Sequence, residues 1–255
     1  MIRIYEGDNL SRLRELSDKT YNLIYVDPPY NTGRKQIRKR ETDTFGYDDT
    51  FDDFIGFLRP RFEEAYRILK DDGSLFFQLD YREIHYCKVM LDEIFGRDCF
   101  MNEIIWAYDW GARSKTRWSC KHDNILWYVK NPKSYTFHYD QIDRVPYITK
   151  SEGLVSKEKQ ELGKTLTDVW WNTIVCGNEK NGYATQKPLK ILERIVKVHS
   201  NEGDQCLDFF AGSGSFGEAC AKNNRDCDLI DQNKDAIMVM KERFKNYEYE
   251  LYGKE

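Results

Sequence analysis

The chain has 255 residues, of which 40% are hydrophobic and 15% aromatic, and this composition predicts a folded protein with a substantial core rather than a disordered chain. No uncharged stretch approaches the roughly 20 residues that cross a bilayer, and no apolar leader follows Met1, so we expect a soluble cytoplasmic protein without a membrane partner. Seven scattered cysteines and four dispersed histidines include no Cys-x-x-Cys pair and no ligand-spaced cluster, which favours free thiols and predicts no metal site.

Short apolar runs alternate with helical patterns, and this alternation indicates an α/β fold with a mainly parallel sheet. The expected strands are residues 2–5, 22–26, 74–79, 103–106, 124–129, 205–210 and 227–230. Helical faces are expected near residues 10–16, 54–69, 189–199 and 237–244. Between residues 108 and 182 the pattern degrades into charged stretches, so we predict one domain, residues 1–107 and 183–255, with residues 108–182 inserted into it.

Two groups of cations contrast with the net charge of −4. The first group lies within residues 34–40 and consists of Arg34, Lys35, Arg38, Lys39 and Arg40. The second group accompanies Trp110 and Trp118 and consists of Arg113, Lys115, Arg117 and Lys121. A run of charge is usually a solvated loop. A nucleic-acid partner would need such local cations to neutralise its phosphates, so both interpretations stay open on charge alone.

The segment Asp27-Pro28-Pro29-Tyr30 directly follows the expected strand 22–26. Two prolines cannot continue a central strand, so the chain leaves the sheet there in a stiff turn, at the strand end where ligands bind in α/β folds. The Asp27 carboxylate and the Pro28 carbonyl would then be adjacent acceptors for the two hydrogens of a planar amine, whose nitrogen lone pair becomes more nucleophilic when both hydrogens are held. A flipped base could stack on Tyr30. The alternative is an ordinary proline turn.

A second loop, residues 208–217, reads Asp-Phe-Phe-Ala-Gly-Ser-Gly-Ser-Phe-Gly between an expected strand and a helix. Gly212 and Gly214 permit a tight turn and close backbone approach to a ligand. Asp231 stands nineteen residues after Gly212, where a carboxylate can accept both hydroxyls of a ribose. The motif alone fits either NAD or S-adenosylmethionine. Only about forty residues follow it, and a dehydrogenase has no use for Asp27-Pro28-Pro29-Tyr30, so we favour S-adenosylmethionine.

Together the two loops resemble the β-class amino-methyltransferases of DNA, in which the Asp-Pro-Pro-Tyr segment precedes the glycine loop of the cofactor. Further matching segments are residues 6–10, 47–49, 69–75, 102–106, 122–126, 184–196 and 201–204. The resemblance implies a Rossmann-like methyltransferase sheet with a circularly permuted motif order. Strands 205–210 and 227–230 would be the first two, and strands 2–5 and 22–26 the third and fourth. Residues 1–107 would form the catalytic half, 183–255 the cofactor-binding half and 108–182 a small target-recognition region.

The resemblance also assigns site residues. The expected catalytic residues are Asp27, Pro28, Pro29 and Tyr30. The expected cofactor-binding residues are Asp8, Asp27, Thr185, Gln186, Lys187, Phe210, Gly212, Ser213, Gly214 and Asp231. Asp8 is expected at the cofactor adenine, Asp231 at its ribose and Lys187 near its carboxylate. Many relatives have Asp-Pro-Phe and Thr-Thr where this chain has Asp208-Phe209-Phe210 and Ser215-Phe216, and we expect these departures to change packing only.

The implied reaction is direct methyl transfer to N6 of adenine in duplex DNA after base flipping, without a covalent enzyme intermediate. Both cation groups would contact phosphates, since the first follows the base pocket and the second lies in the target-recognition region. Cytosine N4 is an alternative target, and an RNA or single-strand methyltransferase and a non-catalytic DNA-binding relative are alternative functions. Retention of Asp27 and the glycines argues against the non-catalytic relative. A homodimer and a separate cognate restriction endonuclease are partners by family analogy alone.

Overall fold

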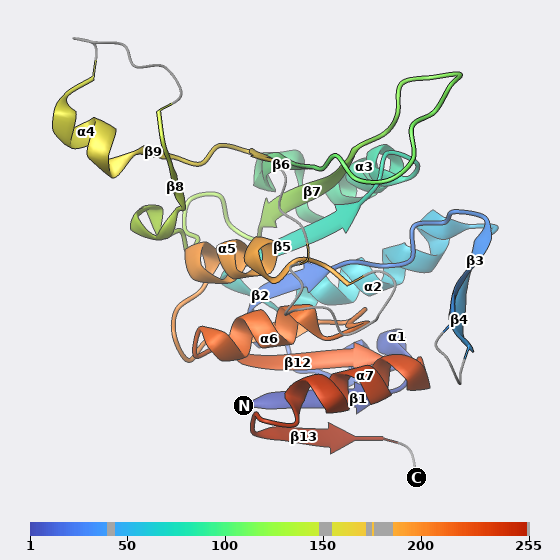
Figure 1. Ribbon diagram of the computed structural model, residues 1–255. Helices are drawn as coiled ribbons and strands as arrows, with labels where there is room; N and C mark the ends of the chain where they lie inside the picture. The colour runs from blue at the N-terminus through green and yellow to red at the C-terminus, as the bar shows by residue number, and fades with distance from the viewer. Residues whose placement is uncertain (40–43, 148–154, 172–174, 176–185, 254–255) are drawn as a thin grey trace.

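The computed structural model describes residues 1–39, 44–147, 155–171, 175 and 186–253. Within these residues one sheet contains nine strands in the order β10-β6-β7-β5-β2-β11-β12-β1-β13 (Figure 1). The strands are β1 (Ile2–Glu6), β2 (Tyr21–Val26), β5 (Leu69–Leu79), β6 (Phe100–Ala107), β7 (His122–Val129), β10 (Val169–Trp171), β11 (Gln205–Asp208), β12 (Asp226–Asp231) and β13 (Tyr249–Tyr252). All neighbours are parallel except the two pairs that include β7. The start of β7 therefore lies at the edge where the other strands end.

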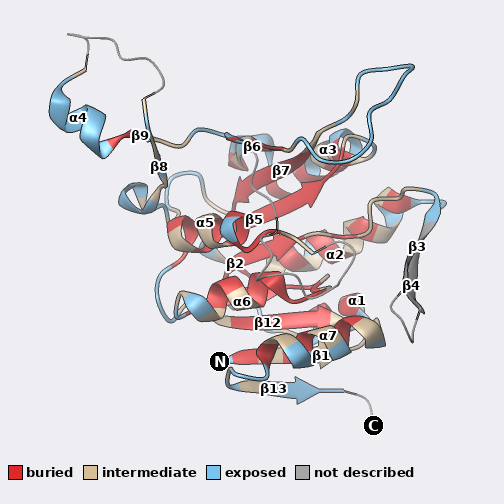
Figure 2. Cartoon of the chain, viewed as in Figure 1, coloured by how far each residue is buried: buried red, intermediate tan, exposed pale blue. Residues whose placement is uncertain are grey.

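Helices cover both faces of the sheet (Figure 1). One face packs against α1 (Asn9–Glu15), α2 (Phe54–Ile68) and α3 (Ile84–Phe95), and the other against α5 (Leu189–His199), α6 (Ser215–Lys222) and α7 (Lys234–Phe244). Every residue of β2 is buried, as its continuous apolar run predicts for a strand covered on both faces (Figure 2). Leu23 and Tyr25 enter one core, and Ile24 and Val26 enter the other.

The permuted order of strands is confirmed. β11 lies between β12 and β2, and β12 pairs in parallel with β1, so the two ends of the chain meet inside one sheet. The N-terminal ammonium of Met1 lies 2.6 Å from Asp226 Oδ1, and Arg3 Nε lies 2.6 Å from Asp228 Oδ1. These ion pairs join the first strand of the chain to one of its last strands.

Several elements were not expected from the sequence. The cation-rich residues after Tyr30 begin an antiparallel hairpin of β3 (Arg34–Lys39) and β4 (Thr44–Asp49), instead of the solvated loop that was one interpretation of the charge. Helix α3 and the edge strand β13 were also missed. The short elements are η1 (Arg97–Cys99), η2 (Tyr139–Gln141), β8 (Arg144–Val145), α4 (Lys157–Leu162) and β9 (Lys164–Thr165). The glycine loop starts earlier than expected, because β11 ends at Asp208.

Two parts of the predicted insertion, residues 108–182, belong to the main sheet. β7 lies between β5 and β6, and β10 pairs with β6. The parts that leave the sheet are an exposed loop, residues 108–121, and a segment with α4 and the β8–β9 ladder, which projects at the upper left of Figure 1. None of the described helices is long and apolar enough to cross a membrane.

Candidate active site

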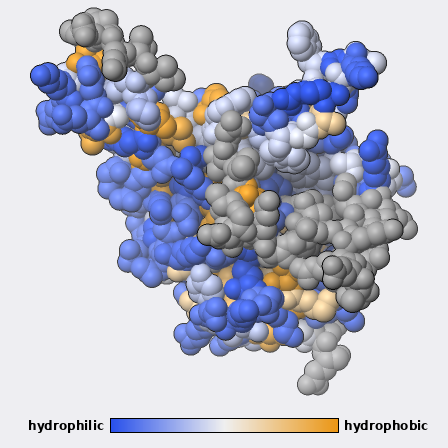
Figure 3. All heavy atoms as spheres, viewed as in Figure 1, coloured by the Kyte–Doolittle hydropathy of each residue, from blue (hydrophilic) through white to orange (hydrophobic). Residues whose placement is uncertain are grey.

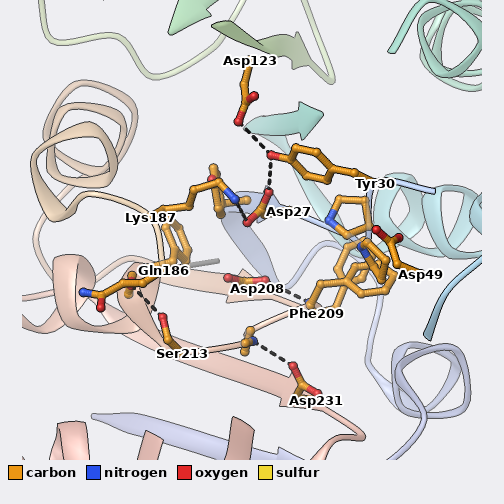
Figure 4. Close-up of a pocket in the computed structure, with 18 of the residues that line it drawn as sticks. Asp27, Tyr30, Asp49, Asp123, Gln186, Lys187, Asp208, Phe209, Ser213 and Asp231 are labelled. Atoms are coloured by element: carbon orange, nitrogen blue, oxygen red, sulfur yellow. Dashed lines mark hydrogen bonds and ion pairs between the residues drawn. The ribbon is translucent and has the colours of Figure 1, made fainter. Parts of the chain in front are cut away.

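A cavity of about 640 Å³ lies at the edge of the sheet where the parallel strands end. Its wall contains residues 27–30 after β2, residues 210–213 after β11, and Asp231 at the end of β12 (Figure 4). Parallel strands bring their carboxyl ends to one edge, so two loops that are far apart in the sequence share this cavity. Its volume lies within the range of sites for small ligands.

Asp27 lies on the cavity wall, directly after the end of β2 and before Pro28 and Pro29. The Lys187 ammonium contacts Asp27 Oδ2, and the Tyr30 hydroxyl lies 3.0 Å from Asp27 Oδ1 (Figure 4). Burial raises the pKa of Asp27, and the nearby charge of Lys187 opposes that rise. Both carboxylate oxygens therefore have a partner within the protein. The predicted catalytic residues Asp27, Pro28, Pro29 and Tyr30 are brought together on the cavity wall.

Asp123 is a second buried carboxylate at this cavity. Its Oδ2 lies 3.0 Å from the Tyr30 hydroxyl and accepts a hydrogen bond of 3.0 Å from Gln78 Nε2, and its Oδ1 accepts one of 3.0 Å from the Tyr108 hydroxyl. The sequence analysis noted Asp123 only within a matching segment. Asp123 was not predicted as a site residue, because it lies near the start of the antiparallel strand β7 and not at the end of a parallel strand.

The glycine loop is held against Asp231. The carboxylate of Asp231 accepts hydrogen bonds of 2.8 Å from the backbone N–H groups of Gly212 and Asn233, and burial raises its pKa. Gly212, Ser213 and Phe210 line the cavity as expected. Gly214 does not line it. Its φ of +73° begins α6, and it packs against Met240 and Phe244 of α7. Gly214 therefore shapes the loop, and its expected contact with a cofactor stays a prediction.

Asp8 lies outside the set of residues that line the cavity. It caps α1 by accepting a hydrogen bond of 2.8 Å from the backbone N–H of Ser11, the alternative role that a carboxylate before Leu10 also fits. The neighbouring Asn9 does line the cavity, and its amide donates to the Phe209 carbonyl at 2.7 Å. Arg61 of α2 fixes Asn9 through a hydrogen bond of 2.7 Å. The expected contact of Asp8 with a cofactor stays a prediction.

Two expected cofactor residues, Gln186 and Lys187, line the cavity, and Thr185 lies outside the described residues. Asp49 is a lining residue that was not assigned a role. Its buried carboxylate accepts hydrogen bonds from the Asn31 backbone N–H at 2.8 Å and the Thr32 hydroxyl at 2.5 Å. Asp49 therefore shapes the chain immediately after Tyr30.

The cations of the second group lie on the exposed loop 108–121, whose first residues Tyr108 and Trp110 line the cavity. Arg113 pairs with Asp109, and Arg117 donates to the Tyr81 hydroxyl at 3.2 Å. Lys115 is exposed, and Trp118 is 96% exposed. Mostly hydrophilic residues cover the projection at the upper right of the space-filling view (Figure 3).

The first group of cations lies on the β3–β4 hairpin. Arg34 is exposed, Lys35, Arg38 and Lys39 belong to β3, and Arg40 lies outside the described residues. The hairpin follows the cavity wall directly, since Tyr30 and Thr32 line the cavity and Gly33 donates a backbone hydrogen bond of 2.9 Å to Asp49.

The sequence is similar to known DNA methylases. A DNA methylase family model matches residues 21–242. The type II methyltransferase M.HpaI of Haemophilus parainfluenzae is 32% identical over 94% of this chain and 73% of its own length. The DNA adenine methyltransferase YhdJ of Escherichia coli K12 is 29% identical over 92% of this chain and 80% of its own.

Solved structures agree on the fold. The crystal structure of the M1.HpyAVI–SAM complex superposes with a TM-score of 0.65 at 23% identity, covering 96% of this chain and 99% of that one. Because the family model spans most of the chain, and a relative is 32% identical over 94% of it, this protein belongs to the family of N6/N4 DNA methylases.

Proposed function

We propose that this protein binds S-adenosylmethionine and transfers its methyl group to the exocyclic N6 of adenine in duplex DNA. The observation that carries the proposal is the meeting of Asp27, the acceptor for an amine, with the glycine loop and Asp231 in one cavity. Among the relatives, the protein from Escherichia coli is a DNA adenine methyltransferase. The solved structure of M1.HpyAVI contains SAM.

The cofactor half of the cavity fits S-adenosylmethionine by its donor and acceptor set. Each oxygen of Asp231 accepts a single backbone N–H, which leaves lone pairs for the two ribose hydroxyls. The Phe210 and Phe57 rings, 6.1 Å apart, supply an apolar wall, and Lys187 supplies a cation for the cofactor carboxylate. When bound, the cofactor supplies an electrophilic methyl group on its sulfonium.

Asp27 and Tyr30 act on the target base. Because Asp27 lies on the wall of a cavity and its side chain is only 15% exposed, a target paired inside a duplex cannot reach it, and the base has to be flipped out. Asp27 accepts a hydrogen of the exocyclic amine, which directs the nitrogen lone pair away from the ring system, and the Tyr30 ring offers a stacking surface. Positioning of the two reactants supplies most of the rate enhancement in such a transfer.

The duplex would contact the two cation groups, on the β3–β4 hairpin that follows the cavity wall and on the exposed loop 108–121, whose first residues line the cavity. Residues 108–182 would then read the target sequence, while residues 1–107 and 183–255 carry catalysis and cofactor binding. Cytosine N4 remains the alternative target, since it offers the same amine geometry. A homodimer and a cognate endonuclease rest on family analogy alone.

Transfer of labelled methyl from S-adenosylmethionine tests the proposal. We expect label in mixed-sequence duplex DNA with the wild type and with Asp140→Ala, an exposed and remote control, and none with Asp27→Ala. Single-stranded DNA and RNA serve as competing substrates in parallel reactions. Preferential labelling of RNA, or undiminished transfer by Asp27→Ala, would contradict the proposal.

A further inference from the structure

Asp123, which lies opposite Asp27 across the Tyr30 hydroxyl, has no role in the reaction as described so far. We propose that Asp123 is a positioning residue that draws the Tyr30 hydroxyl hydrogen away from Asp27 and so frees Asp27 Oδ1 to accept a hydrogen of the target amine. The inference rests on the proposed function, because it concerns how Asp27 becomes available to that amine.

The Tyr30 hydroxyl has two carboxylate neighbours and one hydrogen. The Tyr30 hydroxyl lies 3.0 Å from Asp27 Oδ1 and 3.0 Å from Asp123 Oδ2, yet it has a single hydrogen to donate. It also accepts from Gln78 Nε2 at 3.3 Å. Two carboxylates therefore compete for one hydrogen, and the hydroxyl has two arrangements, one with the hydrogen on Asp27 and one with it on Asp123.

Two side-chain donors, from Gln78 and Tyr108, hold the Asp123 carboxylate in place as an acceptor. Asp123 is 5% exposed, and the Tyr108 hydroxyl and Gln78 Nε2 fix its two oxygens. Gln78 is itself oriented, because its Oε1 accepts a hydrogen bond of 2.7 Å from the buried Tyr25 hydroxyl. The Gln78 amide thus donates to both Asp123 and the Tyr30 oxygen. Tyr25, Gln78 and Asp123 belong to the neighbouring strands β2, β5 and β7, so the sheet fixes the position of the Asp123 carboxylate.

The position of the Tyr30 hydrogen decides whether Asp27 Oδ1 can accept another hydrogen. Lys187 contacts Asp27 Oδ2, so Oδ1 is the oxygen over which Tyr30 and an incoming amine compete. When Tyr30 donates to Asp123, Oδ1 is uncovered while the Gln78 hydrogen bond still holds the Tyr30 oxygen, and with it the ring, in place. The loss of Asp123 should therefore slow methyl transfer and leave cofactor and DNA binding nearly unchanged.

The test is a double-mutant cycle between Asp123→Asn and Tyr30→Phe, measured as the single-turnover rate of methyl transfer. An amide oxygen is a weaker acceptor than a carboxylate, so in Asp123→Asn the Tyr30 hydrogen stays on Asp27. We expect this variant to be slower than the wild type by about tenfold or more, with the Kd for cofactor and for DNA changed by less than about threefold. In the Tyr30→Phe background the same substitution should change the rate by less than about threefold.

Two further variants separate this role from simple stabilisation. Asp92→Asn is a matched control, since Asp92 accepts a hydrogen bond of 2.7 Å from Tyr128, another residue of β7, away from the cavity. It should lower Tm without changing the rate. Asp123→Glu keeps a carboxylate and should transfer methyl faster than Asp123→Asn.

Equal rate losses from Asp123→Asn in both backgrounds would overturn the inference while leaving the proposed function intact. So would an Asp123→Glu variant slower than Asp123→Asn. A wild type that methylates no DNA would refute the proposed function, and this inference with it.

Discussion

Gly214 is a position in the glycine loop where the fold leaves little room for a side chain. A Cβ atom there would lie 2.9 Å from Met240 Cγ and 2.9 Å from Phe244 Cε2, both from buried residues of α7. The residue also has a φ of +73°, which costs a non-glycine residue roughly 1–2 kcal/mol. Displacing packed side chains costs about 1–3 kcal/mol more. We therefore expect Gly214→Ala to lower the free energy of unfolding by about 2–5 kcal/mol.

Gly203→Ala separates the two contributions. Gly203 has a φ of +81°, but a Cβ atom there would meet nothing within 4 Å, so only the conformational part, roughly 1–2 kcal/mol, should be lost. Urea denaturation measures both variants. Because Gly214 is followed by α6 and preceded by the cavity residue Ser213, Gly214→Ala should also weaken cofactor binding, whereas Gly203→Ala should not. Equal losses of stability in the two variants would refute the packing argument.

Three other predictions concern charge and exposure. Asp27 is a stronger acceptor of an amine hydrogen when it is ionised, so the rate should fall as pH drops through its raised pKa. Lys187→Met removes the charge that opposes the rise of this pKa, so the acid limb of the pH profile of kcat should move to higher pH. An unmoved limb would contradict this. Trp118→Ala should weaken duplex binding by about fivefold or more, measured by fluorescence anisotropy. The control is Tyr86→Ala, which removes a 67% exposed ring of α3 and should leave binding unchanged. Equal effects of the two substitutions would argue against a contact between Trp118 and DNA. Burial lowers the pKa of His199 to about 3. As pH falls below about 6.5, His199 therefore binds a proton in the unfolded chain but not in the folded one, and the folded protein loses stability towards acid pH. Between pH 7 and 5 the wild type should lose about 2 kcal/mol more than His199→Phe in urea denaturation, and parallel losses would show that His199 titrates normally.

The parts of the site that were predictable lie where parallel strands end. Asp27, Gly212 and Asp231 each follow an apolar run, and parallel strands place such positions at one edge whatever their distance in the sequence. The apolar run of β2, residues 23–26, is also typical of a strand that is buried on both faces. The order in which β1 follows β12 came instead from the resemblance to the β-class amino-methyltransferases, since no pattern within either strand states its neighbour.

The missed parts depend on strand direction and on pairing partners. Asp123 reaches the cavity only because β7 is antiparallel, and the sequence of an isolated strand does not state its direction. β10 and β13 are short or exposed edge strands, so they lack a buried apolar run. Helix α3 had a readable signal, since Ile84, Cys87, Leu91 and Phe95 recur at helical spacing and are all buried.

For Asp8, the sequence could not separate two possible roles of the same carboxylate. An acid before an apolar helix predicts an N-cap and a ligand contact equally well, and the cap is what the described geometry contains. Only the packing of Asn9 and Arg61 distinguishes which residue of this turn reaches the cavity wall.

The central claim is that Asp27 presents the exocyclic amine of a flipped adenine to the methyl donor. Its most direct test is mass spectrometry of nucleosides from duplex DNA incubated with S-adenosylmethionine and either the wild type or Asp27→Ala. The account predicts N6-methyladenine from the wild type and none from Asp27→Ala. N4-methylcytosine as the only product would contradict the assignment of the base, and equal methylation by both proteins would contradict the role of Asp27.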